Sequence, residues 1–234
     1  MSEGGPSPRV AAVVLADGEI AGEPSAFVRV LDRTLLALCT ETLDACPEIQ
    51  GFVVVAPPGV EDRAADAARA STKFLTSVPG RPTRPQSVAD GVDALPLQFH
   101  IVVCHDVARP LASPALFGEV LRGLDGADAA VPRVPVADTV KRVADGLVQQ
   151  TIPREALGML QTPQAFRRQA LVTANRNETG DRDAPTDVVP FPVPAGIRVA
   201  TVPGDPANFA VRSPGDLRLA ERLLADRLSR RDGR

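Results

Sequence analysis

The residues best suited to chemistry in this sequence lie in CHDVARP, residues 104–110, directly after the apolar run IVV. Such a run is typical of a buried strand, so His105, Asp106 and Arg109 are expected at its carboxyl end, where open α/β sheets bind ligands. A carboxylate and a guanidinium this close can hold a divalent cation beside an anionic substrate. The plain alternative is an Asp–Arg pair that braces the turn before a helix.

Two later stretches point toward the same end of the sheet. VADTVK, residues 136–141, follows another apolar run and offers Thr139 and Lys141. QTPQAF, residues 161–166, supplies Thr162 and a proline, a pattern typical of a loop that enters a helix. For this stretch, simple helix capping is the alternative.

The N-terminal stretch from residue 10 to residue 30 has the outline of a phosphate-binding loop. The apolar run 10–15 leads into Gly18, as a first strand leads into a turn. Phosphate sites in such turns rely on backbone amides and on positive charge. This turn instead carries acidic side chains, and residues 11–28 contain no lysine or arginine.

Strand-like and helix-like patterns alternate along most of the chain. Strands are expected near 9–16, 51–58, 72–78, 99–106 and 127–136, and helices near 34–46, 60–70, 85–95 and 114–124. The apolar runs are continuous rather than alternating, which indicates parallel strands buried on both faces. The sequence therefore predicts an open, mostly parallel α/β sheet flanked by helices, with ligands bound beyond the carboxyl ends of its strands.

This rhythm breaks at residues 138–164. The tripeptide ADG lies between two short strand-like pieces and predicts a β-hairpin arm, at about 138–156, that projects from the sheet. A helix near 166–175, a strand near 198–202 and a charged helix near 214–230 follow. We expect one domain over residues 9–230, preceded by a flexible polar tail at residues 1–8.

Composition narrows the class of protein. The 234 residues suit one large domain, with a net charge of −3 and 3% aromatic residues, none of them Trp or Tyr. Nucleic acid is therefore not expected as a partner. No apolar stretch approaches the roughly 18 residues of a membrane span. The three cysteines are odd in number and lack metal-binding spacing, so reduced, packing thiols and a cytoplasmic location are expected.

The motifs taken together resemble a known family. HDVARP, DTVK, IPREALGMLQTPQAF, TD at residues 186–187 and GDPANFAVRSPGDLRLAE occur in the order and spacing of the 2-C-methylerythritol 4-phosphate cytidylyltransferases of non-mevalonate isoprenoid biosynthesis. The ribitol-phosphate cytidylyltransferases share much of this pattern. The resemblance covers residues 9–227, and HDxARP with QTPQxF is a specific combination.

This resemblance implies a fold, a reaction and partners. The fold would be a Rossmann-like nucleotidyltransferase fold whose β-arm interlocks two subunits into a homodimer. The reaction would transfer CMP from CTP to a polyol phosphate such as methylerythritol phosphate, releasing pyrophosphate with Mg²⁺ as the assisting ion.

The resemblance also implies roles for individual residues. Asp106 would meet the metal, while Arg109, Thr139 and Thr162 would line the acceptor-phosphate pocket and Arg154 would reach it from the partner's arm. The nucleotide-binding residues implied are Ala16, Gly18, Gly80, Arg84 and Ser87. The last three lie in VPGRPTRPQSV, where the family has its cytosine-recognition loop, although Arg81 replaces the second glycine.

The sequence departs from the family at its basic positions. Ala21 and Ser25 replace the arginine and lysine of the loop, and Ala210 replaces a C-terminal lysine. Ile20 stands where a second glycine is expected, and a β-branched residue resists the positive φ that glycine adopts. Substitutes near in sequence are Arg29, Arg33 and Arg81.

These replacements fall on one mechanism. Phosphoryl-type transfer depends on positioning and on stabilising developing charge, and one lost donor typically costs about 10²- to 10³-fold. We therefore expect impaired or lost catalysis, with the acceptor side intact. Three hypotheses remain: a slow cytidylyltransferase, a catalytically silent paralogue that binds a ligand or an active partner subunit through the arm, and a nucleotidyltransferase with another nucleotide or sugar phosphate.

Overall fold

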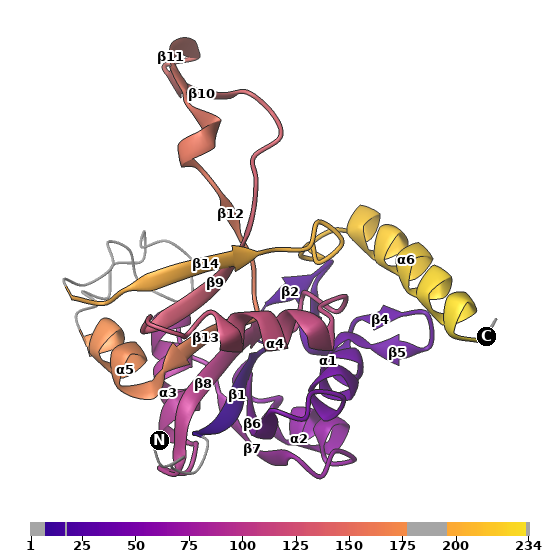
Figure 1. Ribbon diagram of the computed structural model, residues 1–234. Coiled ribbons are helices and arrows are strands. Elements are labelled where there is room, and N and C mark those ends of the chain that lie inside the picture. The colour runs from indigo at the N-terminus through magenta and orange to yellow at the C-terminus, as the bar shows by residue number, and fades with distance from the viewer. Residues whose placement is uncertain (1–7, 17, 177–195, 233–234) are drawn as a thin grey trace.

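The computed structural model describes residues 8–16, 18–176 and 196–232. One sheet forms its centre, with strand order β12-β9-β13-β8-β1-β6-β7 and β14 paired with β9 (Figure 1). Its strands are β1 (Arg9–Leu15), β6 (Ile49–Ala56), β7 (Phe74–Pro79), β8 (Phe99–Asp106), β9 (Ala129–Val134), β12 (Met159–Leu160), β13 (Gln164–Arg167) and β14 (Val199–Pro203). Two short hairpins, β2 (Glu19–Ile20) with β3 (Glu23–Pro24) and β4 (Arg29–Val30) with β5 (Arg33–Thr34), lie between β1 and the first helix.

Helices cover both faces of the sheet. They are α1 (Leu35–Asp44), α2 (Glu61–Ala68), α3 (Arg84–Asp93), α4 (Pro114–Arg122), α5 (Arg168–Arg176) and α6 (Pro214–Asp232). Alternate residues of β1 enter different cores: Ala12 packs in the core shared with α1, α2, α4 and α6, and Val13 in the core shared with α3 and α5. This two-sided burial is the physical reason for the continuous apolar runs.

The predicted parallel sheet is confirmed at its centre. β1 pairs in parallel with β6 and β8, and β6 pairs in parallel with β7. The predicted loop at residues 161–166 is wrong in part, because β13 begins at Gln164 and runs antiparallel between β8 and β9. Four residues are too few to show an alternation pattern, although Ala165 and Phe166 are buried as a central strand requires.

The predicted β-arm is present and projects away from the sheet (Figure 1). Its strands β10 (Val140–Ala144) and β11 (Leu147–Ile152) are antiparallel, and a 3-10 turn, Arg154–Ala156, follows. Asp145 and Gly146 both have positive φ, 52° and 75°, as a tight primed hairpin turn requires. The ADG signal therefore identified the turn itself.

Parts of two predictions lie outside the described residues. They are residues 1–7 of the N-terminal tail and the TD pair at residues 186–187. Within the described part of the chain, no helix combines the length and apolar character needed to span a bilayer.

Candidate active site

Several predicted site residues meet at one edge of the sheet because parallel strands end there together. Leu15 at the end of β1 is paired with Val55 of β6 and with Asp106 of β8. Beyond these ends, the Ala16 amide donates to the carbonyl of Val55 at 2.8 Å, and the Gly80 amide donates to the carbonyl of Ala56 at 2.7 Å. The predicted nucleotide-binding and metal-binding positions therefore lie on adjoining strands.

The backbone amide and both carboxylate oxygens of Asp106 form hydrogen bonds. Its amide donates to the Thr162 hydroxyl at 2.9 Å, and its Oδ1 accepts from the Ala108 amide at 2.9 Å. Its Oδ2 accepts from both terminal nitrogens of Arg84, at 3.0 and 3.2 Å. The structure thus pairs the predicted metal residue directly with a predicted nucleotide residue.

His105, the residue before Asp106, contacts the same Thr162 hydroxyl. It is buried, and its Nδ1 lies 3.2 Å from the Thr162 hydroxyl oxygen. Burial lowers the pKa of His105 to about 4, opposed by Asp106 and aided by Arg109. The Thr162 hydroxyl oxygen already accepts a hydrogen bond from the Asp106 amide. We therefore assign the Thr162 hydroxyl as the donor to Nδ1 of a neutral His105 imidazole.

Arg109 and Thr162 join the C-terminal segment in one network. Arg109 donates to the carbonyls of Asn208, at 2.7 Å, and Leu160, at 3.4 Å. The Asn208 amide group donates to the Thr162 carbonyl at 2.8 Å, and Gln161 donates to the Asn208 carbonyl at 3.1 Å. The sequence placed His105 at this end of the strand without assigning it a role, and it did not single out Gln161, although Gln161 lies inside a quoted motif.

Ser87 shapes the predicted cytosine loop from inside. Its hydroxyl accepts from the Arg81 amide at 2.8 Å and donates to the Arg81 carbonyl at 3.3 Å. The Ser87 side chain is buried, so in this structure it holds the loop backbone that follows Gly80.

The loop after β1 folds as the β2–β3 hairpin, which corrects one expectation. Ile20 does not take a positive φ; it is buried in β2, and the turn falls on Ala21 and Gly22, with φ of 52° and 82°. The Ser25 amide donates to the Gly18 carbonyl at 2.8 Å, which closes the hairpin. The Ser25 hydroxyl is buried without a hydrogen-bond partner among the described residues.

The arginines suggested as substitutes have acidic or carbonyl partners elsewhere. Arg33 pairs with Glu41 at 2.6 Å, Arg81 pairs with Asp90 at 3.2 Å, and Arg29 donates to the carbonyl of Asp32. Lys73 donates to three carbonyls at the end of α1, those of Leu43, Asp44 and Cys46. Arg84 is instead the arginine that contacts Asp106.

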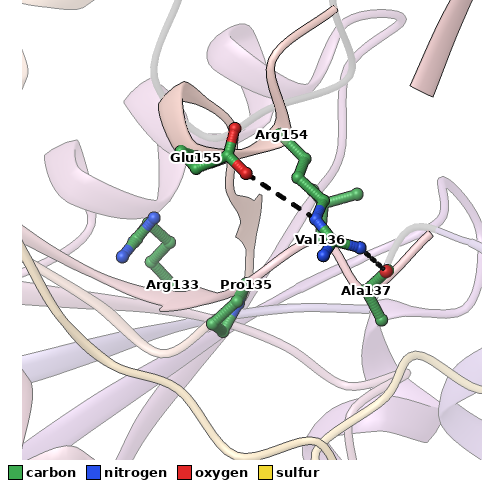
Figure 2. Close-up of a pocket in the computed structure, with 6 residues that line it drawn as sticks. All are labelled: Arg133, Pro135, Val136, Ala137, Arg154 and Glu155. Atoms are coloured by element: carbon green, nitrogen blue, oxygen red, sulfur yellow. Dashed lines mark hydrogen bonds and ion pairs between the residues drawn. The ribbon is translucent and has the colours of Figure 1, made fainter. Parts of the chain in front are cut away.

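Arg154 begins the 3-10 turn that follows β11 of the arm. It lines a pocket of about 350 Å³ together with Arg133, Pro135, Val136, Ala137 and Glu155 (Figure 2). It donates to the Ala137 carbonyl, and its Nε lies 3.8 Å from a Glu155 oxygen. Thr139, two residues after Ala137, is exposed. Among the described residues, Arg154 therefore contacts Ala137 and Glu155 and not Arg109 or Thr162.

Among the described residues, the side chains around Asp106 do not by themselves form a metal site. The described residues contain no group of three His, Cys, Asp or Glu side chains placed to hold an ion. Asp106 offers one carboxylate, and both of its oxygens already accept hydrogen bonds. Mg²⁺ is commonly held by one or two carboxylates together with substrate phosphates, so this carboxylate alone is an incomplete site.

The cysteines behave as packing residues, as expected. All three are buried free thiols: Cys39, Cys46 and Cys104. Burial raises the pKa of the Cys46 thiol to about 12 and raises the pKa of the other two further. Thiols with a raised pKa form little thiolate near neutral pH, so they are poor nucleophiles.

Comparison with known proteins decides the family. The family described as IspD: 2-C-methyl-D-erythritol 4-phosphate cytidylyltransferase matches residues 10–226. The chain belongs to this family. It is 39% identical over 225 residues to the 2-C-methyl-D-erythritol 4-phosphate cytidylyltransferase of Frankia casuarinae, covering 94% of this chain and 82% of that protein.

A second relative and a solved structure extend the comparison. The bifunctional enzyme IspD/IspF of Anaeromyxobacter dehalogenans is 36% identical over 88% of this chain, which spans 54% of that longer protein. The crystal structure of 2-C-methyl-D-erythritol 4-phosphate cytidylyltransferase from Thermus thermophilus is 32% identical and superposes with a TM-score of 0.68, covering 91% of this chain and 98% of that one. The Rossmann-like nucleotidyltransferase fold is therefore confirmed.

Proposed function

We propose that this chain transfers CMP from CTP to 2-C-methyl-D-erythritol 4-phosphate. An oxygen of the acceptor phosphate attacks the α-phosphorus of CTP, the bond to the bridging oxygen of the β-phosphate breaks, and pyrophosphate leaves. The observation that carries the proposal is the network in which Asp106, Arg109 and Thr162, from the family's motifs, are fixed around one edge of the sheet. The relative from Frankia casuarinae, a 2-C-methyl-D-erythritol 4-phosphate cytidylyltransferase, supports the same reaction.

The chain's own residues supply orientation in this proposal. The carbonyl contacts of Arg109 hold its guanidinium in place toward the acceptor phosphate, since a fixed arginine binds phosphate with little loss of freedom. The Thr162 hydroxyl is engaged by Asp106 and His105, so we assign it to positioning the end of β8. Ser87 positions the loop that would receive the cytosine.

The loop chemistry sets the expected rate. Ala21, Ser25 and Ala210 place no cation where the family has three, so we propose turnover slower than that of relatives with intact loops. The alternative of a silent paralogue gains no support from the structure or from the relatives. A cytoplasmic location and the homodimer remain part of the proposal. The exposed apolar residues of the arm support the dimer: Val143, Leu147 and Val148.

The proposal is tested by direct assay of the purified protein. With CTP, methylerythritol phosphate and Mg²⁺, we expect a product carrying both the CMP group and the polyol phosphate, detected by mass spectrometry, with one pyrophosphate released per product. Arg109→Ala should raise KM for the acceptor. ATP, GTP, UTP and ribitol 5-phosphate test the third hypothesis in the same assay. A folded protein that gives no product with any of these pairs would exclude the enzyme proposal.

A further inference from the structure

Arg63, the third residue of α2, lies against the segment in which the loop has lost its lysine. Its guanidinium carbon is 3.7 Å from the centroid of the Phe27 ring. Phe27 ends the 3-10 turn Ser25–Phe27, and the family resemblance places the missing lysine at Ser25, in the same turn. The helix that follows β6 therefore brings an arginine to a turn that has no cation of its own.

The start of α2 lies at the edge of the sheet where the site residues meet. At the end of β6, the Val55 carbonyl accepts from the Ala16 amide at 2.8 Å. The next carbonyl, that of Ala56, accepts from the Gly80 amide at 2.7 Å. Ala16 and Gly80 are predicted nucleotide-binding positions, and only a short connection separates the end of β6 from α2. The first turn of α2, with Arg63, is therefore beside the predicted nucleotide site.

The acidic residues of α2 leave the charge of Arg63 available. Glu61 accepts a hydrogen bond from a backbone amide of the preceding turn at 2.8 Å, and Asp66 pairs with Arg69. Asp62 is the neighbour of Arg63 in the chain, and adjacent helix residues do not face each other. Among the described residues, Arg63 forms no hydrogen bond or ion pair, and its contact is with the aromatic ring.

A guanidinium held over an aromatic ring keeps its N–H groups for another ligand. These groups form a planar fork that matches pairs of phosphate oxygens. The Phe27 ring attracts the cation through its π face, and it is only 5% exposed, so it is a fixed support. Arg63 itself is exposed. The hairpin carries Glu19 and Glu23, so a triphosphate beside it needs positive charge from another element.

We propose that Arg63 binds the triphosphate of CTP from α2 and supplies the positive charge that Ser25 does not. The Phe27 ring holds the guanidinium beside the loop, and the side chain donates to phosphate oxygens when the nucleotide binds. Arg63 is thereby a further nucleotide-binding residue, a role that rests on the proposed function because CTP is the ligand.

Calorimetric titration of the full chain with CTP and Mg²⁺ measures this role without turnover. In Arg63→Gln, we expect the Kd for CTP to rise by about tenfold or more, because hydrogen bonds between charged groups are lost. Cytidine, which has no phosphate, should bind the variant and the wild type equally, whereas a damaged fold would weaken both ligands. Arg69→Gln removes the same charge from the other end of α2 and should leave the Kd for CTP unchanged.

Two further variants test whether charge is the cause. Arg63→Lys should keep most of the wild-type affinity for CTP. Ser25→Lys combined with Arg63→Gln should restore it, because both positions serve the same phosphates.

The outcomes separate this role of Arg63 from the proposed function. If the wild type binds CTP and a folded Arg63→Gln variant binds it equally well, the role is overturned while CMP transfer stands. If CTP binding depends on Arg63 but no product forms, the proposed function fails and the role stands. A wild type that does not bind CTP overturns both.

Discussion

His105 shows what one buried side chain contributes to the site. It follows four buried residues of β8, 101–104, and packs against the ring of Phe117, with ring centroids 5.2 Å apart. In this setting the imidazole is neutral, and a neutral ring can accept the Thr162 proton where an imidazolium cannot. The hydrogen bond that orients the end of β8 therefore depends on the protonation state of His105.

This dependence predicts a pH effect on stability. The pKa of His105 falls from 6.5 to about 4 on folding, so between these values the unfolded chain binds more protons. The contribution of neutral His105 to the free energy of unfolding is therefore complete above pH 6.5. It is lost as pH falls toward 4, which lowers the free energy of unfolding by roughly 3 kcal/mol. We expect urea unfolding to show this extra loss in the wild type and not in His105→Gln.

The only other histidine supplies the control. His100 is exposed at the opposite end of β8, so His100→Gln should keep the wild-type pH profile. An identical profile for His105→Gln and the wild type would show that His105 does not carry the effect.

The replaced basic residues give a second prediction at this scale. Ala21→Arg, Ser25→Lys and Ala210→Lys together should raise kcat/KM for CTP by about 10²-fold or more, because each restores charge at the triphosphate. Steady-state kinetics measure the change. The control places the same charges at exposed positions of the amino edge of the sheet, as Gln50→Lys, Thr72→Lys and Gln98→Arg. No difference between the two triple variants would mean that the hairpin backbone, and not the missing charge, limits turnover.

At the scale of elements, α3 matters most because it carries Arg84 and Ser87 to the sheet. It approaches closely through Gly91: a Cβ there would lie 2.5 Å from a Val13 methyl carbon and 2.9 Å from one of Val55. Any displacement of α3 would therefore move both the guanidinium and the loop-holding hydroxyl.

Two glycine substitutions separate packing from helix propensity. Gly91→Ala should lower the free energy of unfolding by about 1–3 kcal/mol, because the methyl group overpacks the sheet. Gly118→Ala, inside α4, meets only the flexible Arg122 side chain, with the nearest atom at 3.2 Å, and should be neutral or stabilising by up to about 1 kcal/mol. Urea unfolding of both variants provides the comparison. Equal effects would contradict the close approach of α3.

At the scale of the whole molecule, the arm is notable because it exposes apolar side chains that this chain alone does not cover. Val143, Leu147 and Val148 are 58–67% exposed, and in the part of the chain that the structure describes β10 and β11 form a two-stranded sheet of their own. A two-stranded hairpin with exposed apolar side chains is marginally stable alone, which favours a partner surface around it.

We predict that the arm holds a dimer together. Replacing Val143, Leu147 and Val148 with threonine keeps β propensity and removes apolar area, so the variant should sediment as a monomer while the wild type sediments as a dimer. Leu97→Thr, at an exposed position on the body, should remain dimeric. A monomeric wild type at assay concentrations would remove the arm from the proposed mechanism.

Mixed dimers test whether the sites are shared between subunits. Arg154→Ala alters the arm and Arg109→Ala alters the pocket, so each variant alone should be weakly active. If an arm completes its partner's site, mixing the two and allowing exchange should restore up to about a quarter of wild-type activity, since one intact site forms per mixed dimer. Activity that stays at the level of the separate variants would place both arginines in the same subunit's site.

The sequence by itself determined the family, the central parallel sheet and the arm. These features depend on local patterns: continuous apolar runs for strands buried on both faces, ADG for the hairpin, and motif order for the resemblance. The tertiary structure decided β13, the pairing of Arg84 with Asp106, and the network of Gln161 and Asn208. Its hydrogen bonds join residues far apart in sequence, 56 from Asp106 to Thr162 and 99 from Arg109 to Asn208. Local patterns carry no information on such distances, because only the packing of strands and helices brings these groups together.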